Sequence, residues 1–287
     1  MTMDITAESA GLAGTQPQTA LRSTQDAPVF EVANPNGSAP VLLLADHAGR
    51  EVPASLNRLG LGDAPFERHI AYDIGVEVMT RRLADRLDAP ALIYNYSRLL
   101  IDPNRSLDDP TSICAVSDGV IVPANRILTP EDAEARAAEF FHPYHRAIDD
   151  WLNRFAARGA APSVISIHSF TEQFRGVERP WHVGILWGDE GGLSLPLIER
   201  LRQEPDLCIG DNEPYSGRNR HGYTVETHAY PRDLANTLIE VRQDLVDTEE
   251  KAEAWGDRLA DCLEPLLSNG GYGDSGFTQD NNKAVNA

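Results

Sequence analysis

The sequence predicts a single α/β domain with a mixed central sheet and helices on both faces, and three observations predict it. Short, continuous apolar runs recur along the chain, and such runs are typical of strands buried on both faces of a sheet. Amphipathic helical patterns lie between these runs, and alternation of strands with helices favours an α/β sheet. No segment rich in Pro and Gly divides the middle of the 287-residue chain, which favours one domain over two.

The predicted strands are apolar runs of four to six residues. They are Val41–Ala45, Ala91–Tyr96, Val164–Ile167, Val183–Trp187 and Thr237–Val241.

Three segments carry helical patterns. Residues 66–87 place Ile70, Ile74, Val78 and Leu83 on one stripe. A second helix begins at Thr129, which is a typical N-cap followed by a proline at the first helical position, and runs to about residue 158. A third covers about 247–267.

The two ends of the chain are expected to lie outside the folded domain. Residues 1–27 are rich in Thr, Ala, Gln and Ser without an apolar period, and residues 269–287 are rich in Gly, Asn and Asp. We therefore expect a disordered N-terminal tail, a folded domain over residues 28–268 and a disordered C-terminal tail.

The composition excludes several classes of partner. The net charge is −19, from 44 acidic and 25 basic residues, so neither nucleic acid nor an anionic membrane is expected as a partner. Three scattered cysteines without a CxxC pair support neither a disulfide framework nor a cysteine zinc site. The N-terminus lacks the apolar core of a signal peptide and no transmembrane run occurs, so we expect a cytoplasmic protein.

Two histidines lie at the ends of predicted strands. His47 follows the strand 41–45 in the motif Asp-His-Ala-Gly, and His168 follows the strand 164–167 directly. Sites in open α/β sheets form beyond the carboxyl ends of strands, and neighbouring strands lie about 4.8 Å apart. Imidazole nitrogens suit zinc. A single such histidine is more often structural, but two in matching positions favour a metal site.

A third, carboxylate ligand is expected, and two candidates remain open. Asp73 lies in a mostly apolar stretch, and Glu51 lies four residues after His47. Each could instead be an ordinary solvated acid.

A polar segment with two arginines follows the second predicted strand. It contains Arg98, Asp102, Asn104 and Arg105. A guanidinium can hold a carboxylate with two hydrogen bonds, so Arg105 beside Asn104 is interpreted as a substrate clamp. For Arg98 and Asp102, a structural ion pair is the competing interpretation.

The last predicted strand continues into charged residues. Glu240 and Arg242 alternate on it, so their side chains point to the same side. Burying both costs free energy unless they pair or act in chemistry. A catalytic carboxylate and a structural salt bridge are therefore both open.

A polar loop over residues 212–217, with His221 beyond it, is either a lid or a plain surface loop. Tyr215 in this loop is a candidate substrate contact. His142 and His145 lie three residues apart on the second predicted helix among aromatic residues, and we expect them at the surface or the edge of the core, not as metal ligands.

The order of these motifs resembles the N-formylglutamate amidohydrolase family. The motifs are DHAG, DIG, SRLLIDPNR, SIHSF, NEPYSG, HG and EVRQDL, and they span about Val41 to Leu245. The resemblance implies a carboxypeptidase-like (phosphorylase/hydrolase-like) α/β fold, a catalytic domain over residues 28–268 and one Zn²⁺ per chain.

The resemblance also implies roles for single residues. Carboxypeptidases bind zinc through a first histidine and a second one at a strand end, hold the substrate carboxylate with a D-x-N-R segment, and use the glutamate of an E-x-R strand as general base. These parts fall on His47, His168, Asp102-Asn104-Arg105 and Glu240-Arg242. The metal-binding glutamate of carboxypeptidases has Arg50 in its place here, so the third ligand is open. Asp73, the acid of the family's D-x-G motif, is preferred to Glu51.

These expectations combine into a zinc-dependent hydrolase of linear amides that cleaves a small acidic N-acyl amino acid, N-formylglutamate above all. Zinc would lie on the two histidines and the third ligand, Glu240 would act as general base, and Arg98 or Arg242 would assist at a second carboxylate or an oxyanion. A deacylase for another N-acyl amino acid or aminoacyl amide, and a metal-free carboxylate-binding protein, are the alternatives. The sequence does not predict an oligomeric state.

Overall fold

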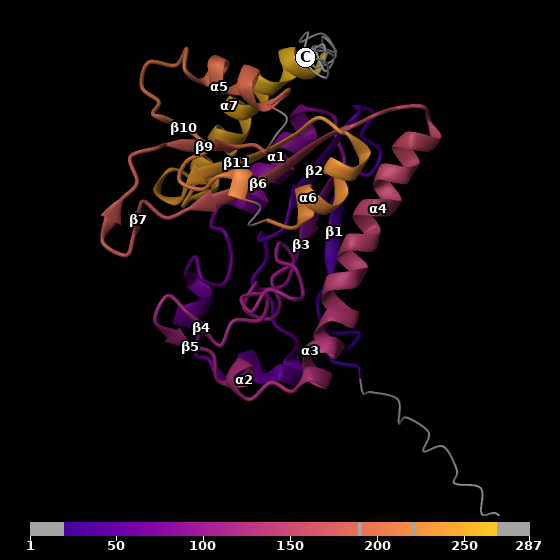
Figure 1. The fold of residues 1–287 in the computed structure, drawn as a ribbon, viewed down its shortest axis with the longest axis vertical. Helices are drawn as coiled ribbons and strands as arrows, with labels where there is room; N and C mark the ends of the chain where they lie inside the picture. The colour runs from indigo at the N-terminus through magenta and orange to yellow at the C-terminus, as the bar shows by residue number, and fades with distance from the viewer. Residues whose placement is uncertain (1–19, 189–190, 220–221, 269–287) are drawn as a thin grey trace, which may run out of the picture.

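A seven-stranded mixed sheet lies at the centre of the fold (Figure 1), and the computed structural model describes residues 20–188, 191–219 and 222–268. The strand order is β1-β3-β2-β6-β11-β9-β10. The four strands β3, β2, β6 and β11 are parallel, whereas β1 runs antiparallel to β3 and β9 runs antiparallel to β11. The strands are β1 (Phe30–Ala33), β2 (Val41–Ala45), β3 (Ala91–Tyr94), β6 (Ser163–Phe170), β9 (Val183–Leu186), β10 (Ile209–Asp211) and β11 (Asn236–Arg242).

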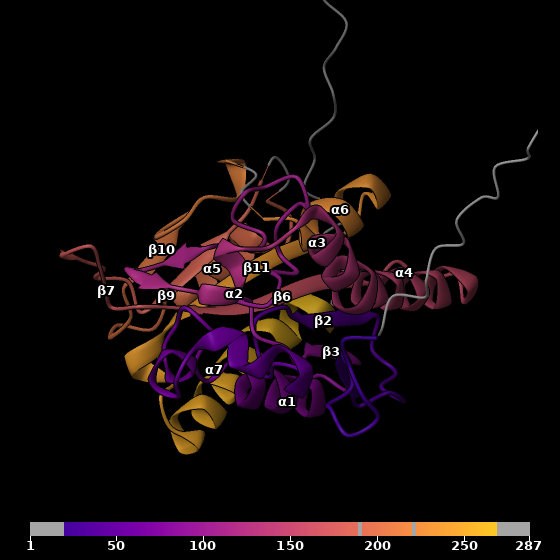
Figure 2. The same ribbon diagram turned by 90° about the horizontal axis from the view of Figure 1, so that it is seen from below.

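Helices cover both faces of this sheet, as Figure 2 shows. In β2, Leu43 packs into one core cluster while Leu42 and Leu44 pack into the other. This is why the strand is apolar at every position. One face carries α1 (Val76–Arg86), α5 (Ser194–Leu201) and α7 (Glu249–Ser268), and the other carries α4 (His142–Ala157) and α6 (Thr224–His228). The predicted single-domain α/β fold with a mixed sheet is confirmed.

All five predicted strands occur, and two further strands were not predicted. β1 and β10 are the two edges of the sheet. β1 is partly exposed and β10 has three residues, so neither carries the continuous apolar run by which the inner strands are predicted. Two small hairpins lie outside the main sheet. They are β4 (Val116–Ser117) with β5 (Val120–Ile121), and β7 (Gln173–Phe174) with β8 (Val177–Glu178).

The predicted helix over residues 66–87 is wrong in its first half. A 3₁₀ turn covers Ala64–Glu67, and α1 begins only at Val76. Gly75 has a φ of +79°, which interrupts a right-handed helix and favours glycine. A side chain at Gly75 would also lie 2.3 Å from the carbonyl oxygen of Val246. The chain before α1 is therefore a turn, and this turn carries one of the candidate ligands.

The other two predicted helices are confirmed. α3 (Pro130–Arg136), a π-helical turn (Ala137–Phe141) and α4 follow one another without a break, and Thr129 caps α3 by accepting the N–H of Asp132 at 3.2 Å. α7 matches the third predicted helix. A short helix, α2 (Pro123–Arg126), precedes α3. None of the helices in the described part of the chain combines the length and apolar character needed to cross a membrane.

The expected tails lie mostly outside the described residues. Residues 20–27, expected in the N-terminal tail, pack against the domain. The N–H groups of Leu21 and Arg22 donate to the Glu139 carboxylate at 2.7 and 2.8 Å, and the hydroxyl of Tyr96 donates to Ala27 O at 2.7 Å. The packed part of the chain therefore begins before residue 28.

Candidate metal centre and substrate cavity

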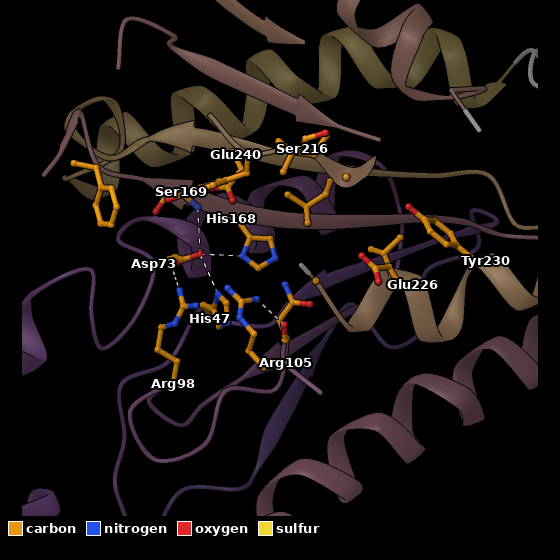
Figure 3. A pocket seen from close by; sticks show the side chains of 18 residues that line it. His47, Asp73, Arg98, Arg105, His168, Ser169, Ser216, Glu226, Tyr230 and Glu240 are labelled. Atoms are coloured by element: carbon orange, nitrogen blue, oxygen red, sulfur yellow. Dashed lines mark hydrogen bonds and ion pairs between the residues drawn. The ribbon is translucent and has the colours of Figure 1, made fainter. Parts of the chain in front are cut away.

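A cavity of about 350 Å³ opens beside the carboxyl ends of the central strands (Figure 3). Apolar side chains form part of its wall, among them Phe174, Leu186, Val225 and Leu238. The predicted site residues that line it are His47, Asp73, Arg98, Asn104, Arg105, His168, Tyr215 and Glu240.

Strand order brings the two predicted histidines together. β2 and β6 are parallel neighbours, His47 lies just beyond the end of β2, and His168 lies near the end of β6. Asp73 approaches from the turn before α1, where its backbone N–H donates to His47 O at 2.8 Å. All three side chains are buried. The three preferred ligands thus meet at one point of the sheet edge.

Each of these side chains presents one candidate ligand atom. Asp73 Oδ2 lies 2.9 Å from His168 Nδ1 and 3.4 Å from His47 Nδ1, and all three atoms lie within 4.8 Å of one another. His47 Nδ1 is buried and has no hydrogen-bond partner among the described residues. Buried polar atoms normally have a partner, so a nitrogen left in this state suits a metal ligand. Two imidazole nitrogens and a carboxylate oxygen fit zinc or a similar divalent ion.

Asp102 fixes the orientation of the His47 ring. Its Oδ1 lies 2.7 Å from His47 Nε2, and its Oδ2 accepts a hydrogen bond from Arg98 Nη2 at 2.7 Å. Burial acts to raise the pKa of Asp102, but the charges of Arg98 and His47 outweigh it and hold this pKa well below its usual range. A metal-binding histidine commonly donates its second ring nitrogen to a carboxylate, which sets the tautomer. Asp102 therefore leaves Nδ1 of His47 for a metal.

His168 is held in a matching way from the other side. Its Nε2 lies 3.0 Å from Ser166 Oγ and 3.6 Å from Asp46 Oδ2, and Tyr144 donates to the second oxygen of Asp46 at 2.8 Å. Burial acts to lower the pKa of His168, but the nearby carboxylates of Asp46 and Asp73 outweigh it and raise this pKa to about 10. Without a metal, His168 is protonated at neutral pH. It must lose a proton before its Nδ1 can bind a metal ion.

Glu51, the alternative third ligand, lies elsewhere. Its side chain is exposed, and its backbone forms an isolated bridge with Tyr96. The pairing with Tyr96 carries the chain away from the metal group after His47. Among the described residues, Asp73 and not Glu51 completes the group with His47 and His168.

Glu240 is a buried carboxylate without a described partner. It is 8% exposed, and its Oε2 has no hydrogen bond within the described part of the chain. Burial raises the pKa of Glu240 to about 7, although the charge of His168 acts in the opposite direction. A carboxylate whose pKa lies near neutrality can accept and return a proton, which is the property of a general base.

The expectation that Arg242 belongs to the cavity requires a correction. Arg242 is not among the side chains that line it. Its guanidinium pairs with Asp244 through two hydrogen bonds of 2.7 and 3.1 Å. It also lies near the carbonyl oxygens of Arg179 and Pro180, at 3.4 and 3.3 Å. Arg242 therefore forms its salt bridge with Asp244 and not with Glu240.

Arg98 links Asp102 with Asp73, one of the three candidate metal ligands. Its Nε and Nη2 bond to Asp102 Oδ2 at 3.1 and 2.7 Å, and its Nη1 lies 3.5 Å from Asp73 Oδ1. Two buried acids thus balance its charge. The ion-pair interpretation of Arg98 and Asp102 is the one that the structure shows.

Asn104 and Arg105 face the cavity from the same turn. Asn104 Oδ1 accepts the N–H groups of Tyr223 and Thr224 at 2.7 and 3.0 Å, so it caps the start of α6, and its Nδ2 makes no hydrogen bond with the described residues. Arg105 Nη1 donates to Asn104 O at 2.8 Å. Figure 3 shows Arg105 and, to its right, Glu226 of α6.

The loop over residues 212–217 is anchored to the sheet. The side-chain oxygen of Asn212 accepts the N–H groups of Trp187 and Gly217, both at 3.0 Å. A side chain at Gly184 would lie 2.0 Å from the carbonyl oxygen of Glu213, so glycine is required for this close approach. These contacts favour a fixed wall over a lid.

The other histidines that the sequence analysis considered are His142, His145 and His221. His145 is buried, with its two ring nitrogens 2.9 Å from His228 Nε2 and from Pro103 O. Burial lowers the pKa of His145 to about 4. Neither His145 nor His142 belongs to a candidate metal group in the described chain. His221 lies outside the described residues.

Three residues of the site were not predicted. Asp46 and Ser166 orient His168, and Glu226 lines the cavity from α6. A usable signal existed for the first two: Ser166 precedes His168 by two positions and so shares its face of β6, and Asp46 ends a fully apolar run. Glu226 carries no comparable signal.

The domain is similar to proteins of known sequence and structure. The sequence model of the family described as N-formylglutamate amidohydrolase matches residues 39–246. A gene product of Agrobacterium tumefaciens with a crystal structure is 27% identical, with a TM-score of 0.83, over 87% of this chain and 98% of that chain. The crystal structure of N-formylglutamate amidohydrolase from Ralstonia eutropha JMP134 is 20% identical and shares the fold, with a TM-score of 0.67, over 85% of this chain and 98% of that chain. No curated protein matches the sequence. Since the family match covers well over half of the sequence, the chain belongs to the N-formylglutamate amidohydrolase family.

Proposed function

We propose that the protein is a metal-dependent amidohydrolase that cleaves the amide of a small acidic N-acyl amino acid, with N-formylglutamate, giving formate and glutamate, as the favoured substrate. The observation that carries this proposal is the meeting of His47 Nδ1, His168 Nδ1 and Asp73 Oδ2 within 4.8 Å beside a buried Glu240. Family membership supports hydrolysis of an amide. A cavity of about 350 Å³ lies near the small end of ligand pockets, which favours a small substrate.

His47, His168 and Asp73 would hold one zinc ion. When bound, the ion supplies Lewis-acid chemistry: it polarises a scissile carbonyl group and lowers the pKa of a water molecule. The protein prepares this site with two outer carboxylates. Asp102 holds the far nitrogen of His47 and Asp46 faces that of His168, so Nδ1 of His47, and Nδ1 of His168 once it has lost its proton, can direct a lone pair at the ion.

Glu240 moves the proton in this scheme. It accepts a proton from the attacking water as the carbon–oxygen bond forms, and it delivers this proton to the amine nitrogen as the carbon–nitrogen bond breaks. In the metal-free protein burial raises the pKa of Glu240 to about 7, so this carboxyl group can both accept and release a proton in a buried position. A protein that only binds carboxylates gains nothing from a second buried acid here, which argues against a non-catalytic role.

Arg105 and Asn104 Nδ2 orient the substrate. Both line the cavity beside the metal group, and a guanidinium is the side chain best suited to a carboxylate. Tyr215 closes the cavity from the other side. Arg98 supports this arrangement indirectly, through Asp102 and Asp73.

Hydrolysis of a longer N-acyl group is the second candidate. Phe174, Leu186, Val225 and Leu238 give the cavity an apolar wall, and a formyl group alone makes little use of such a wall. An N-acetyl or N-succinyl group would fill more of it.

A substrate panel tests both candidates. Zinc-loaded protein is assayed with N-formyl, N-acetyl and N-succinyl derivatives of glutamate, glutamine and leucine. We expect the highest kcat/KM for N-formylglutamate. A preference for another acyl group would select the second candidate, and no hydrolysis of any of these amides would overturn the proposal.

A further inference from the structure

The proposed function gives the substrate two carboxylates, and the inference below rests on that. Two carboxylates require two cationic contacts. The arginines among the described residues that line the cavity are Arg98 and Arg105. Arg98 is already balanced by Asp102 and Asp73. Arg105 can hold one carboxylate, so a dicarboxylic amino acid needs a further cation for the other.

Arg179 is a buried cation next to the cavity wall. It is 9% exposed, and its described hydrogen bonds both run from Nη1 to Thr171, to the carbonyl oxygen at 3.5 Å and to Oγ1 at 3.3 Å. No carboxylate forms an ion pair with it among the residues that the structure describes. A buried charge without a counter-charge costs free energy, which a bound anion would offset.

Aromatic rings surround the Arg179 guanidinium. Its central carbon lies 5.9 Å from the ring centre of Phe170, 4.8 Å from that of Phe174 and 4.9 Å from that of Tyr215. Cation–π contacts stabilise the charge in part, but rings accept none of the strong hydrogen bonds that a guanidinium offers. Phe174 and Tyr215 both line the cavity, whereas Arg179 is not among the lining side chains, so its guanidinium lies behind these two rings at the edge of the cavity.

The two arginines lie on segments next to opposite halves of the sheet. Arg105 follows β3, whereas Arg179 follows the separate β7–β8 hairpin and leads into β9, and Tyr215 follows β10 at the far edge. The two histidines of the candidate metal group lie at the ends of β2 and β6, between them. A substrate whose amide lies at the metal group would thus present one end to each arginine.

Tyr215 offers a hydrogen-bond donor at this position. Its loop is fixed by the contacts of Asn212 and by the close approach of Glu213 to Gly184. Burial and the charge of Glu240 raise the pKa of Tyr215, so its hydroxyl keeps its proton at neutral pH.

We propose that Arg179 and the Tyr215 hydroxyl form a second carboxylate subsite of the cavity, which takes the side-chain carboxylate of an N-acylated dicarboxylic amino acid. The guanidinium supplies the ion pair and the phenol supplies a hydrogen bond. The subsite makes the protein selective for a charged over a neutral side chain of equal size.

Paired substrates test this subsite. N-formylglutamate and N-formylglutamine differ in the side-chain charge and hardly in shape. Arg179→Gln in the zinc-loaded full chain should lower kcat/KM for N-formylglutamate by about 100-fold, as expected for truncation of one partner of a buried charge pair, and leave N-formylglutamine within about threefold. Tyr215→Phe should give a smaller loss, again for N-formylglutamate and not for N-formylglutamine. Arg175→Gln is the control, because Arg175 lies on the same hairpin, is exposed and contacts Phe174.

Parallel losses for both substrates would overturn the subsite and leave Arg179 as a support of the wall. If Arg179→Gln does not fold, Tyr215→Phe decides, and an unchanged glutamate-to-glutamine ratio contradicts the proposal. A binding assay separates this inference from the proposed function. Wild-type protein should bind glutarate at least about tenfold more tightly than glutaramate, and Arg179→Gln should abolish the difference. If the protein hydrolyses no N-formyl amino acid, the proposed function is refuted. If it binds glutarate and glutaramate equally, the subsite is refuted.

Discussion

Glu240 and His168 lie opposite one another on the neighbouring parallel strands β11 and β6. Paired positions on adjacent strands share a face of the sheet, so the candidate base lies beside a candidate metal ligand. Burial raises the pKa of Glu240 to about 7 despite the opposing charge of His168. The sheet itself, and not a loop, therefore sets the distance between proton acceptor and metal group.

The metal group gives the first prediction. His47→Ala and His168→Ala should each reduce zinc from about one ion per chain to a small fraction of that, because a site with two remaining protein ligands binds weakly. Metal content after dialysis, measured by mass spectrometry, checks this. His142→Ala is the control and should keep its zinc. Full activity of the wild type after exhaustive chelation would contradict metal dependence.

The second prediction concerns protons released when the metal binds. The pKa of His168 is raised to about 10 in the metal-free protein, so the metal competes with a proton at neutral pH. Zinc affinity should therefore rise with pH, by up to about tenfold per unit between pH 6 and 9. Calorimetry in buffers of different ionisation enthalpy should show about one proton released per ion at pH 7.5. An affinity that does not change over this range would refute the assigned protonation state.

Asp102 is the subject of the third prediction. Asp102→Asn keeps the shape of the side chain but removes the charge that orients His47, so zinc affinity should fall by about 10- to 100-fold. Competition with a chelator of known affinity measures this fall. Asp108→Asn, an exposed acid in the same segment, should have no effect. Equal zinc affinities of Asp102→Asn and wild type would show that the ring is oriented by other contacts.

The fold and the pair of histidines were predictable because both are written in local patterns. The inner strands each contain a short, mostly apolar run, and β2 and β6 each lead into a histidine that reaches the site. His47 and His168 could thus be placed at the same edge before the strand order was known. Asp73 was chosen as a ligand through the family resemblance, and its place on a helix was wrong because Gly75 breaks the helix pattern.

The contacts that orient the candidate metal ligands could not be predicted, because they join residues distant in sequence. Asp102 lies 55 positions from His47, and the turn that brings Asp73 to His47 depends on Val246 packing against Gly75. Local charge patterns also misled. Alternation placed Arg242 on the side of Glu240, but its guanidinium is long enough to pair with Asp244 instead.

The fourth prediction tests the clamp at Arg105. Arg105→Ala should raise KM for N-formylglutamate and lower kcat/KM. The loss should correspond to about 2–5 kcal/mol of transition-state stabilisation, because a desolvated carboxylate loses its cation. Steady-state kinetics with zinc-loaded protein measure this loss. Arg50→Ala, which removes an exposed arginine outside the cavity, should leave the kinetics unchanged. An unchanged kcat/KM for acidic substrates in Arg105→Ala would exclude the clamp.

The fifth prediction concerns Glu240 and separates an enzyme from a binding protein. Glu240→Gln keeps the size of the side chain but cannot accept a proton. General acid–base catalysis contributes about 10²–10⁴-fold, so kcat should fall by that factor while zinc content and substrate affinity stay near wild type. Glu178→Gln, an exposed acid on the β7–β8 hairpin, is the control.

Stability provides an independent reading of the same variant. The pKa of Glu240 is raised from 4.5 to about 7 on folding, so the stabilising effect of its proton is fully present below pH 4.5 and is lost as pH rises through 7. At pH 8 the metal-free wild type therefore contains a buried carboxylate that opposes folding. Glu240→Gln should increase the free energy of unfolding by about 1–3 kcal/mol at pH 8 and change it little at pH 4, measured by urea denaturation. A residue that served only as a salt-bridge partner would behave in the opposite way: the variant would be less stable at pH 8, with normal turnover per folded molecule.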